Sequence, residues 1–206
     1  MTPTARDPYV YPGTNVLINL RDIRDQARLE QFEADAVFLA NASLKSRPIT
    51  GAFDIARLQE THRRIFGRVY SWAGEVRKDV GLTGKNRSGF VIAYGAAQNV
   101  PGALATTFAA LKTENDLQGL DAAAFAKRMA WYYSEFDAIH AFRDGNSRTL
   151  RVFASDLAQA AGHPLDWARV ARTAEDTQRL YHARDLAVMR GDLSELTAII
   201  AASLRG

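Results

Sequence analysis

The twelve residues from His140 to Arg151 bring several chemically active side chains close together in the chain. They read His-Ala-Phe-Arg-Asp-Gly-Asn-Ser-Arg-Thr-Leu-Arg. An imidazole can take a proton from a hydroxyl group, a carboxylate can bind a hard cation such as Mg²⁺, and guanidinium groups bind phosphate oxygens. The stretch therefore indicates a site that holds a nucleotide polyphosphate on a metal ion and activates a hydroxyl beside it.

The first half of the stretch supplies a base and a metal ligand. We expect His140, which is neutral near pH 7, to be the catalytic residue that accepts the proton of an attacking hydroxyl. We expect Asp144 to coordinate Mg²⁺, which proteins usually hold with one or two carboxylates and the phosphates of the substrate. Phe142 is the large apolar side chain of the loop, and it should point inward and fix the loop to the core.

The second half is suited to binding phosphate. Gly145 and Asn146 permit a tight, left-handed turn in which backbone N–H groups converge on an anion. The N–H and hydroxyl of Ser147 can add to them, and Asn146 is also predicted to cap the helix that follows. The positive end of that helix would then face the phosphates. Arg148 and Arg151 lie three residues apart in its first turns and should both bind phosphate oxygens.

Helices must position these groups, because helical periodicity dominates the sequence. Beginning at Asp121, apolar residues recur every three or four positions and lead directly to His140; they are Phe125, Met129, Tyr132, Phe136 and Ile139. After the stretch, Leu150, Phe153, Leu157 and Ala161 share one face of a second helix that ends at Gly162. Similar patterns predict helices around residues 29–39, 53–67, 173–190 and 192–203.

One segment, residues 76–94, has a different pattern. Two apolar runs, 76–82 and 90–94, flank the polar segment 84–89, which predicts a β-hairpin with its turn in the polar segment. A lone hairpin is only marginally stable, so this one must pack against the helices. The predicted fold class is therefore all-α, a helical bundle with one small hairpin, in a single domain over residues 1–206.

Composition narrows the functional classes. The chain has 206 residues, no cysteine and a formal net charge of +3. The absence of cysteine excludes disulfides and cysteine metal sites and is compatible with the cytoplasm, where we expect the protein. No apolar run approaches the ~20 residues of a membrane span, so no membrane contact is expected. The charge is too small to predict direct nucleic-acid binding.

The stretch 140–151 resembles the signature of the Fic family, His-Pro-Phe-x-Asp/Glu-Gly-Asn-Gly-Arg-x-x-Arg. The likeness extends to residues 11–17, to Trp-Ala-Gly-Glu-Val-Arg at 72–77 and to Ala-Gly-His-Pro-Leu-Asp-Trp at 161–167. It implies a Fic fold with a core of about 53–190 and transfer of AMP from ATP to a Tyr, Thr or Ser hydroxyl of a target protein, with Mg²⁺. Within this family the targets of bacterial members include the type II topoisomerases, DNA gyrase and topoisomerase IV.

In the Fic family the hairpin, here about 76–94, is called the flap, and it pairs with an extended segment of the target by strand addition. The resemblance assigns this docking role to five residues, Lys85, Gly89, Phe90, Val91 and Ile92. The resemblance also implies that an inhibitory helix controls the activity. Many members carry an inhibitory helix, Ser/Thr-x-x-x-Glu-Gly/Asn, whose glutamate pairs with the second signature arginine, here Arg151. This chain lacks that pattern, so the resemblance predicts the toxin of a toxin–antitoxin pair, with the helix on a small antitoxin.

Two departures from the signature leave alternatives open. Ala141 replaces the usual proline, and Ser147 replaces the second glycine, where a positive φ would strain a serine. One alternative is therefore a weakened module that binds partners without catalysis. Another is an enzyme that uses a different nucleotide donor or transfers phosphate or phosphocholine, because fold alone does not determine the donor.

Overall fold

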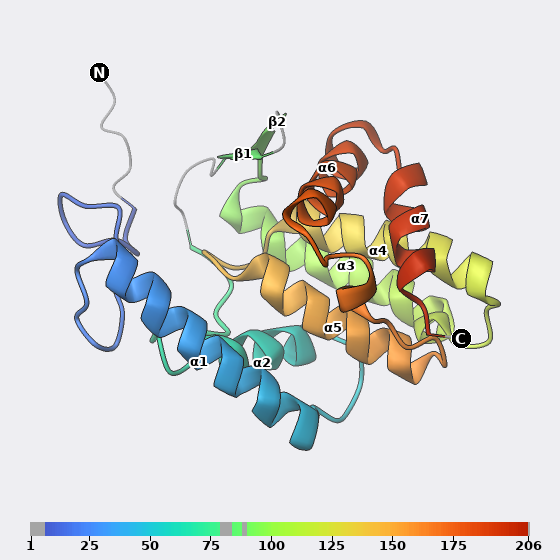
Figure 1. Cartoon of the computed structure of the whole chain (residues 1–206), viewed down its shortest axis with the longest axis horizontal. Coiled ribbons are helices and arrows are strands. Elements are labelled where there is room, and N and C mark those ends of the chain that lie inside the picture. The colour runs from blue at the N-terminus through green and yellow to red at the C-terminus, as the bar shows by residue number, and fades with distance from the viewer. Residues whose placement is uncertain (1–6, 79–83, 88–89, 206) are drawn as a thin grey trace.

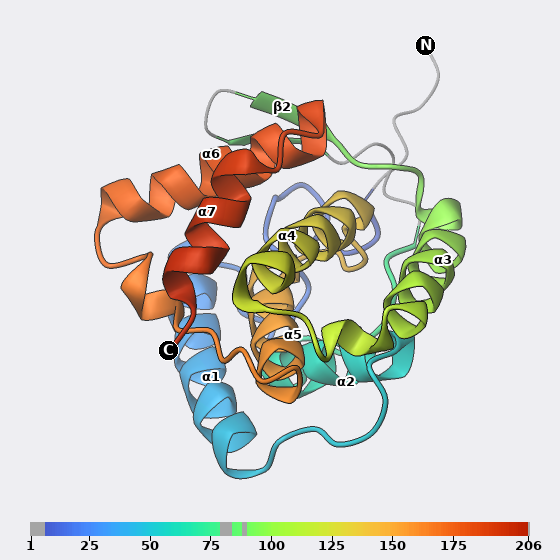
Figure 2. The same ribbon diagram turned by 90° about the vertical axis from the view of Figure 1, so that its right-hand side faces the viewer.

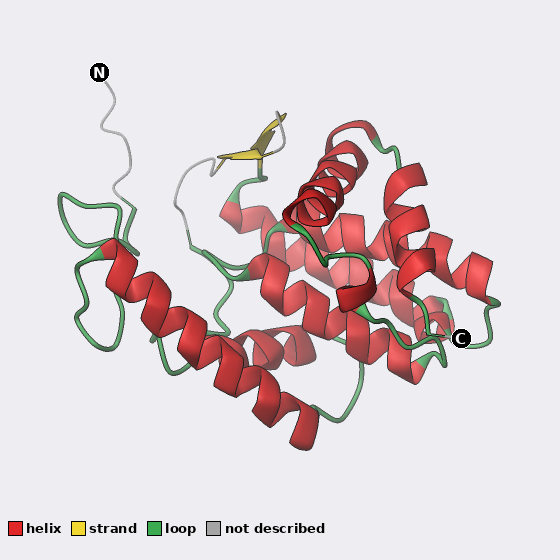
Figure 3. Ribbon diagram, in the orientation of Figure 1, coloured by secondary structure: helices red, strands yellow, loops and turns green. Residues whose placement is uncertain are grey.

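The computed structural model describes residues 7–78, 84–87 and 90–205. This part of the chain forms α-helices and one two-stranded hairpin, as Figure 3 shows. The predicted all-α class is thus confirmed. The α-helices are α1 Gln26–Ser46, α2 Ile55–Phe66, α3 Val100–Thr113, α4 Ala122–Ile139, α5 Asn146–Ala160, α6 Ala174–Arg190 and α7 Ser194–Ser203. Short 3₁₀ turns occupy Ala97–Asn99, Asn115–Leu117 and Trp167–Arg169.

Side-chain caps explain where several helices begin. The carboxylates of Asp25, Asp54 and Asp121 each accept a hydrogen bond from a backbone N–H in the first turn of α1, α2 and α4. Thr173 and Asp176 form a reciprocal capping box at the start of α6. Of these, the cap at Asp121 was predicted from the sequence, and it sets the start of the helix that leads to His140.

Helix α4 lies at the centre of the larger core, with α3, α5, α6 and α7 packed around it (Figure 2). Its inward side chains are almost completely buried; Phe125, Met129, Tyr132 and Tyr133 are each at most 1% exposed. A buried ion pair adds to this packing, since Arg184 of α6 donates to both carboxylate oxygens of Asp137 at 2.6 and 3.0 Å. The helix that carries the predicted base is therefore held on most sides.

A second core joins the N-terminal part of the chain to α2. Tyr9, Tyr11 and Val16 pack with side chains of α1 and with Phe66 and Tyr70. A single β-bridge between Val10 and Leu17 closes the loop before α1. Figure 1 shows the result: α1 and α2 lie on one side of α5, and α6 and α7 lie on the other.

The hairpin differs in position from the prediction. Its strands are β1 Gly84–Arg87 and β2 Phe90–Ala93, paired antiparallel with Lys85 opposite Ile92. The polar segment thus forms a strand itself, and the prediction that it would be the turn between apolar runs was wrong. Residues 79–82 of the predicted first run lie outside the described part of the chain. The helix α3 that follows was also missed, because its sequence carries Pro101 and Gly102 at its start and no strong amphipathic pattern.

Candidate active site

His140 caps the end of α4 in an uncommon backbone conformation. Its φ and ψ are 49° and 61°, in the left-handed region, and its N–H donates to the carbonyl of Phe136 at 3.2 Å. The residue is only 5% exposed. The imidazole is therefore presented from a rigid support rather than from a free loop, as the sequence predicted.

Asn146 braces the signature loop, residues 140–151, from inside. Its side-chain oxygen accepts the N–H of Phe142 at 2.8 Å, and its side-chain nitrogen donates to the carbonyl of Phe142 at 2.7 Å. Because the side chain is used in this way, it does not cap α5. Gly145 occupies the N-cap position, so the predicted capping role of Asn146 was wrong. Phe142 is 2% exposed and stacks on His62, in agreement with its predicted inward position.

Gly145 is the position in the loop that requires glycine. Its φ is +76°, and a Cβ atom placed there would lie 2.3 and 2.5 Å from ring atoms of Phe66. Ser147, by contrast, lies inside α5 and is not among the residues with positive φ. The strain considered for serine at this position is therefore absent. Its N–H belongs to the first turn of α5, where backbone donors have no partner within the helix.

The signature arginine Arg148 is held by two carboxylates. One nitrogen pairs with Glu33 of α1 and another lies 3.5 Å from Asp144. The hydroxyl of Tyr70 donates to the same Glu33. The Tyr70 pKa is raised above its ordinary value, chiefly by burial and also by this bond to Glu33. The guanidinium also lies over the ring of Phe66, 4.6 Å from its centre.

His62 of α2 supports the loop from below. Its Nδ1 accepts the backbone N–H of Gly74 at 2.8 Å, so Nε2 carries the proton and donates to the carbonyl of Asp144 at 3.0 Å. Burial lowers the pKa of His62 to about 4, so the ring is neutral at pH 7. This histidine thus links the Trp-Ala-Gly-Glu segment to the predicted metal ligand. It does not itself face the cavity described next.

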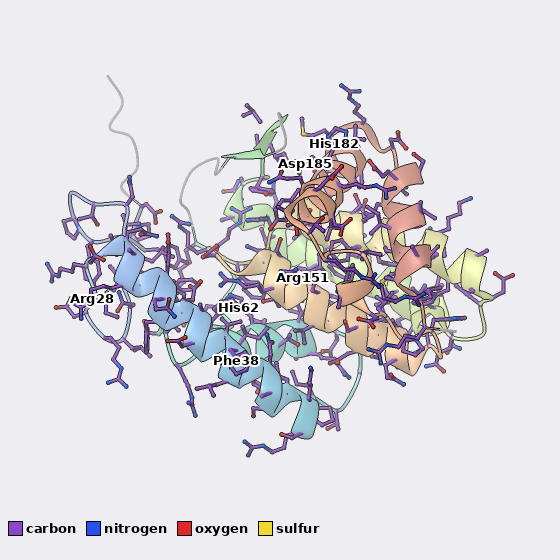
Figure 4. The ribbon with its side chains drawn as sticks, in the orientation of Figure 1. Arg28, Phe38, His62, Arg151, His182 and Asp185 are labelled. Carbon is purple, nitrogen blue, oxygen red and sulfur yellow. The ribbon has the colours of Figure 1, made fainter. Side chains whose placement is uncertain are left out.

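A cavity of about 310 Å³ lies directly over the signature loop. Its lining consists of residues 144–148, Arg151 of α5 and Tyr181 of α6. Figure 4 shows Arg151 on α5, where it also lines a second groove toward α1. All six predicted phosphate and metal residues therefore share one cavity, and α6 provides the opposite wall.

The donor chemistry of this cavity fits Mg²⁺ bound together with phosphate. Asp144 is a hard oxygen ligand whose side chain is 31% exposed, and one of its oxygens has only a 3.5 Å contact with Arg148. Within the described residues there is no cluster of three acidic or histidine side chains that would hold a metal ion alone. Coordination of Mg²⁺ by Asp144 together with the phosphates of a nucleotide stays a prediction.

The predicted docking residues of the flap differ in their exposure to solvent. Val91 is 71% exposed, whereas its neighbour Ile92 is 1% exposed. Lys85 and Phe90 lie in β1 and β2, and Gly89 lies outside the described residues. The alternation places one flap side chain toward solvent and the next toward the helices. Docking by this edge stays a prediction.

Several residues of the site were not identified from the sequence. Glu33 pairs with Arg148, and Tyr70 donates to Glu33. Phe66 underlies the loop, and His62 donates to the carbonyl of Asp144. No spacing rule identifies Glu33, because it lies 115 residues before the arginine it contacts. Contacts of this kind can be recognised only in the folded structure.

Comparison with known proteins gives the family context. A sequence model described as the Fic/DOC family matches residues 52–158. The chain is 37% identical over 199 residues to protein adenylyltransferase VbhT of Bartonella schoenbuchensis, covering 94% of this chain but 40% of VbhT. It is 33% identical over 197 residues to the probable protein adenylyltransferase y4lH of Sinorhizobium fredii, covering 95% of each. It thus spans less than half of VbhT and nearly all of y4lH.

Solved structures agree in fold. The crystal structure of BepC from Bartonella tribocorum with bound AMPPNP, an effector described as VirB-translocated, superposes with a TM-score of 0.84 at 25% identity, covering 96% of each chain. No helix in the described residues combines the length and apolar character that crossing a membrane requires. With the signature loop, the flap and the helical core in place, and with these matches over almost its whole length, this chain belongs to the Fic/DOC family.

Proposed function

We propose that the protein is an adenylyltransferase that moves AMP from ATP to a hydroxyl group of a target protein. The observation that carries the proposal is the cavity over the signature loop, which combines Asp144, the first turn of α5 and two arginines. Relatives that match most of this chain are named protein adenylyltransferases, and the BepC structure contains an ATP analogue. We also propose that the protein acts in the cytoplasm, where ATP is present.

The residues divide the reaction between them. His140 accepts the proton of the target hydroxyl, whose oxygen attacks the α-phosphorus of ATP. The bond from the α-phosphorus to the bridging oxygen breaks, and pyrophosphate leaves. Backbone N–H groups at the start of α5, with Arg148 and Arg151, bind the phosphate oxygens and stabilise the charge that builds up on them. Mg²⁺ bound at Asp144 would neutralise part of the same charge.

Ser147 supports an intact rather than a weakened site. The weakened-module alternative depends on strain at this position, but Ser147 lies in the regular first turn of α5 and is among the residues that line the cavity. Its side chain therefore adds a hydroxyl donor beside the phosphates without distorting the loop.

The surroundings of Arg151 could accept an inhibitory helix from another chain. The second groove, of about 310 Å³, has a largely apolar lining from α1, α5 and Trp167. Arg151 lines both this groove and the cavity over the signature loop, so a helix seated in the groove could bring a glutamate to the guanidinium and compete with the phosphates. We propose that a small antitoxin with the Ser/Thr-x-x-x-Glu-Gly/Asn pattern binds there, which makes this protein the toxin of the pair. Type II topoisomerases are the proposed targets.

Radiolabelled ATP tests the reaction and separates the donor alternatives. Purified protein is incubated with a bacterial lysate, Mg²⁺ and ATP labelled at either the α- or the γ-phosphate. AMP transfer labels proteins from the α position alone, and the band identified by mass spectrometry gives the target. His140→Ala should remove the label, whereas His182→Ala, an exposed change on α6, should not. Label from the γ position would contradict the proposal and indicate phosphate transfer instead.

A further inference from the structure

The imidazole of His140 is stacked face to face on the ring of Tyr94. The two ring centres are 3.6 Å apart and the ring planes differ by 12°. Tyr94 is 3% exposed and His140 is 5% exposed, so the stack is shielded from solvent. The plane of the imidazole, which determines where its nitrogens point, is therefore defined by contact with another aromatic ring.

Arg77 fixes the backbone around the same imidazole. Its Nε donates to the carbonyl of His140 at 2.7 Å, and its backbone N–H donates to the carbonyl of Ala141 at 2.9 Å. A third bond runs from Nη2 to the carbonyl of Gly95 at 2.6 Å. A single side chain, 3% exposed, thus bridges the base and the residue after Tyr94. The planar fork of arginine makes such a double contact possible, and the ammonium of lysine lacks this geometry.

Together these contacts join the flap to the base. Tyr94 directly follows β2, so the strand of the flap continues into the ring that covers the imidazole. Arg77 precedes β1 and donates to the carbonyls of His140 and Ala141, and it also donates to the carbonyl of Gly95, which follows β2. The left-handed backbone at His140 is sparsely populated by residues with side chains and persists when its surroundings enforce it.

We propose that Tyr94 and Arg77 are positioning residues for His140, which orient the imidazole toward the acceptor hydroxyl and couple its orientation to the flap. The catalytic part of this inference rests on the proposed adenylyl transfer. The structural part, that the stack and the bridge determine the imidazole orientation, does not. A target segment aligned by the flap would then meet a base whose position is fixed by the same strand.

Substitutions at Tyr94 separate stacking from simple space filling. Tyr94→Phe keeps the ring, whereas Tyr94→Leu removes it and leaves an apolar side chain. General-base catalysis contributes about 10²–10⁴-fold, so a disoriented imidazole should lower kcat by about 10- to 100-fold in Tyr94→Leu. KM for ATP should stay within about twofold, because neither ring is among the residues that line the nucleotide cavity. Tyr94→Phe should keep kcat within about threefold.

Phe125→Leu is the matched control. Phe125 is also buried, in α4, and its ring also stacks on a histidine, His163, at the far end of that helix from the site. This variant removes a comparable buried ring and should keep kcat near that of the wild type. An equal loss of kcat in Phe125→Leu and Tyr94→Leu would show that general destabilisation is responsible and would overturn the proposal.

Imidazole NMR tests the structural part without any activity. The chain has four histidines, so the His140 ring signals can be assigned by comparison with His140→Ala. In the wild type and in Tyr94→Phe, the face of the aromatic ring should shift the His140 carbon-bound protons upfield. In Tyr94→Leu this shift should disappear while His62 and His163 keep theirs. An unchanged His140 spectrum in Tyr94→Leu would disprove the stack even if the wild type transferred no AMP.

Arg77→Lys tests the bridge. We expect a fall in kcat of about tenfold or more with KM for ATP little changed, and a shift of the His140 ring signals. If Arg77→Lys matched the wild type in both, or if Tyr94→Leu changed the spectrum but not kcat, the two residues would not act as positioning residues and the inference would be wrong.

Discussion

At the scale of single residues, the site depends on close contacts below the signature loop. The ring of Phe66 lies under Gly145 and under the guanidinium of Arg148, and His62 holds the carbonyl of Asp144 from the same side. None of these supporting groups belongs to the signature itself. The loop can expose its N–H groups to a ligand because its underside is already occupied.

Gly145→Ala should damage this arrangement more than an ordinary glycine replacement. Both the left-handed φ and the 2.3 Å approach to Phe66 oppose a methyl group, so we expect a loss of unfolding free energy of about 2–4 kcal/mol and weaker ATP binding. Gly162→Ala is the control, because φ is +84° there but no atom lies within 4 Å of the added carbon. It should cost about 1 kcal/mol. Equal losses in urea denaturation would contradict the role of Phe66.

His62 should make stability depend on pH. Its pKa is about 4 in the folded protein and about 6.5 in the unfolded chain, so the unfolded state binds more protons between these values. The contribution of His62 to the free energy of unfolding is then present above pH 6.5 and is lost as the pH drops toward 4. The loss is about 2 kcal/mol between pH 7 and pH 5. Urea denaturation without nucleotide or metal measures this. His62→Gln should lack this component, and His182→Gln should retain it; parallel curves for the wild type and His62→Gln would refute the assignment.

The sequence indicated which signature residues gather at the candidate site, but it did not indicate the residues that support them. His140, Asp144 and the two signature arginines carry their own chemistry and lie close together in the chain. Asn146 was misjudged because asparagine is a common helix cap, whereas here both of its side-chain groups bind the backbone of Phe142. Contacts between residues far apart in sequence, such as Glu33 with Arg148, leave no local pattern.

At the scale of elements, α4 and α5 present the site, and the flap, α1 and α6 border it. Helix α4 ends directly before the proposed base, His140, and α5 begins at the turn that we propose binds phosphate. Helix α1 supplies Glu33, and α6 supplies Tyr181 and the buried partner of Asp137. Apolar residues at helical spacing predicted α4 and α5, but the short strands of the flap could not be placed from their apolar residues alone.

The exposed side chain of Val91 offers a test of docking by the flap. Val91→Lys puts a charge on a 71% exposed apolar position, which should lower kcat/KM for a protein target by about tenfold while ATP affinity is unchanged. Phe38→Lys is the control, since Phe38 is 75% exposed on α1 (Figure 4). Labelled-AMP transfer and calorimetric ATP titration give the two values. If Phe38→Lys impaired transfer as strongly, the effect could not be assigned to the flap.

At the scale of the whole molecule, nucleotide binding should be visible as added stability. A ligand at 100 times its Kd stabilises the folded state by about 2.7 kcal/mol, which raises the Tm of a domain of this size by about 5–10 °C. We expect this rise with ATP and Mg²⁺ in thermal denaturation, and a much smaller one with EDTA, because Asp144 and the phosphates would share the ion.

Two variants test which residues are needed for the rise in Tm. His140→Ala should keep the full rise in Tm, because His140 is not among the residues that line the cavity. Arg148→Ala should reduce it, because the guanidinium lies in that lining. A complete loss of the rise in His140→Ala would mean that the histidine binds nucleotide, and its assignment as a base would need revision.

The ion pair between Glu33 and Arg148 has a practical consequence for anyone who shortens this protein. The family match begins at residue 52 and stops at residue 158, so a fragment cut to those limits would keep the whole signature. It would nevertheless lack the carboxylate of Glu33 and the wall formed by Tyr181. A miniaturised or grafted version should therefore begin upstream of α1 and extend through α6, even though no signature residue lies in either helix.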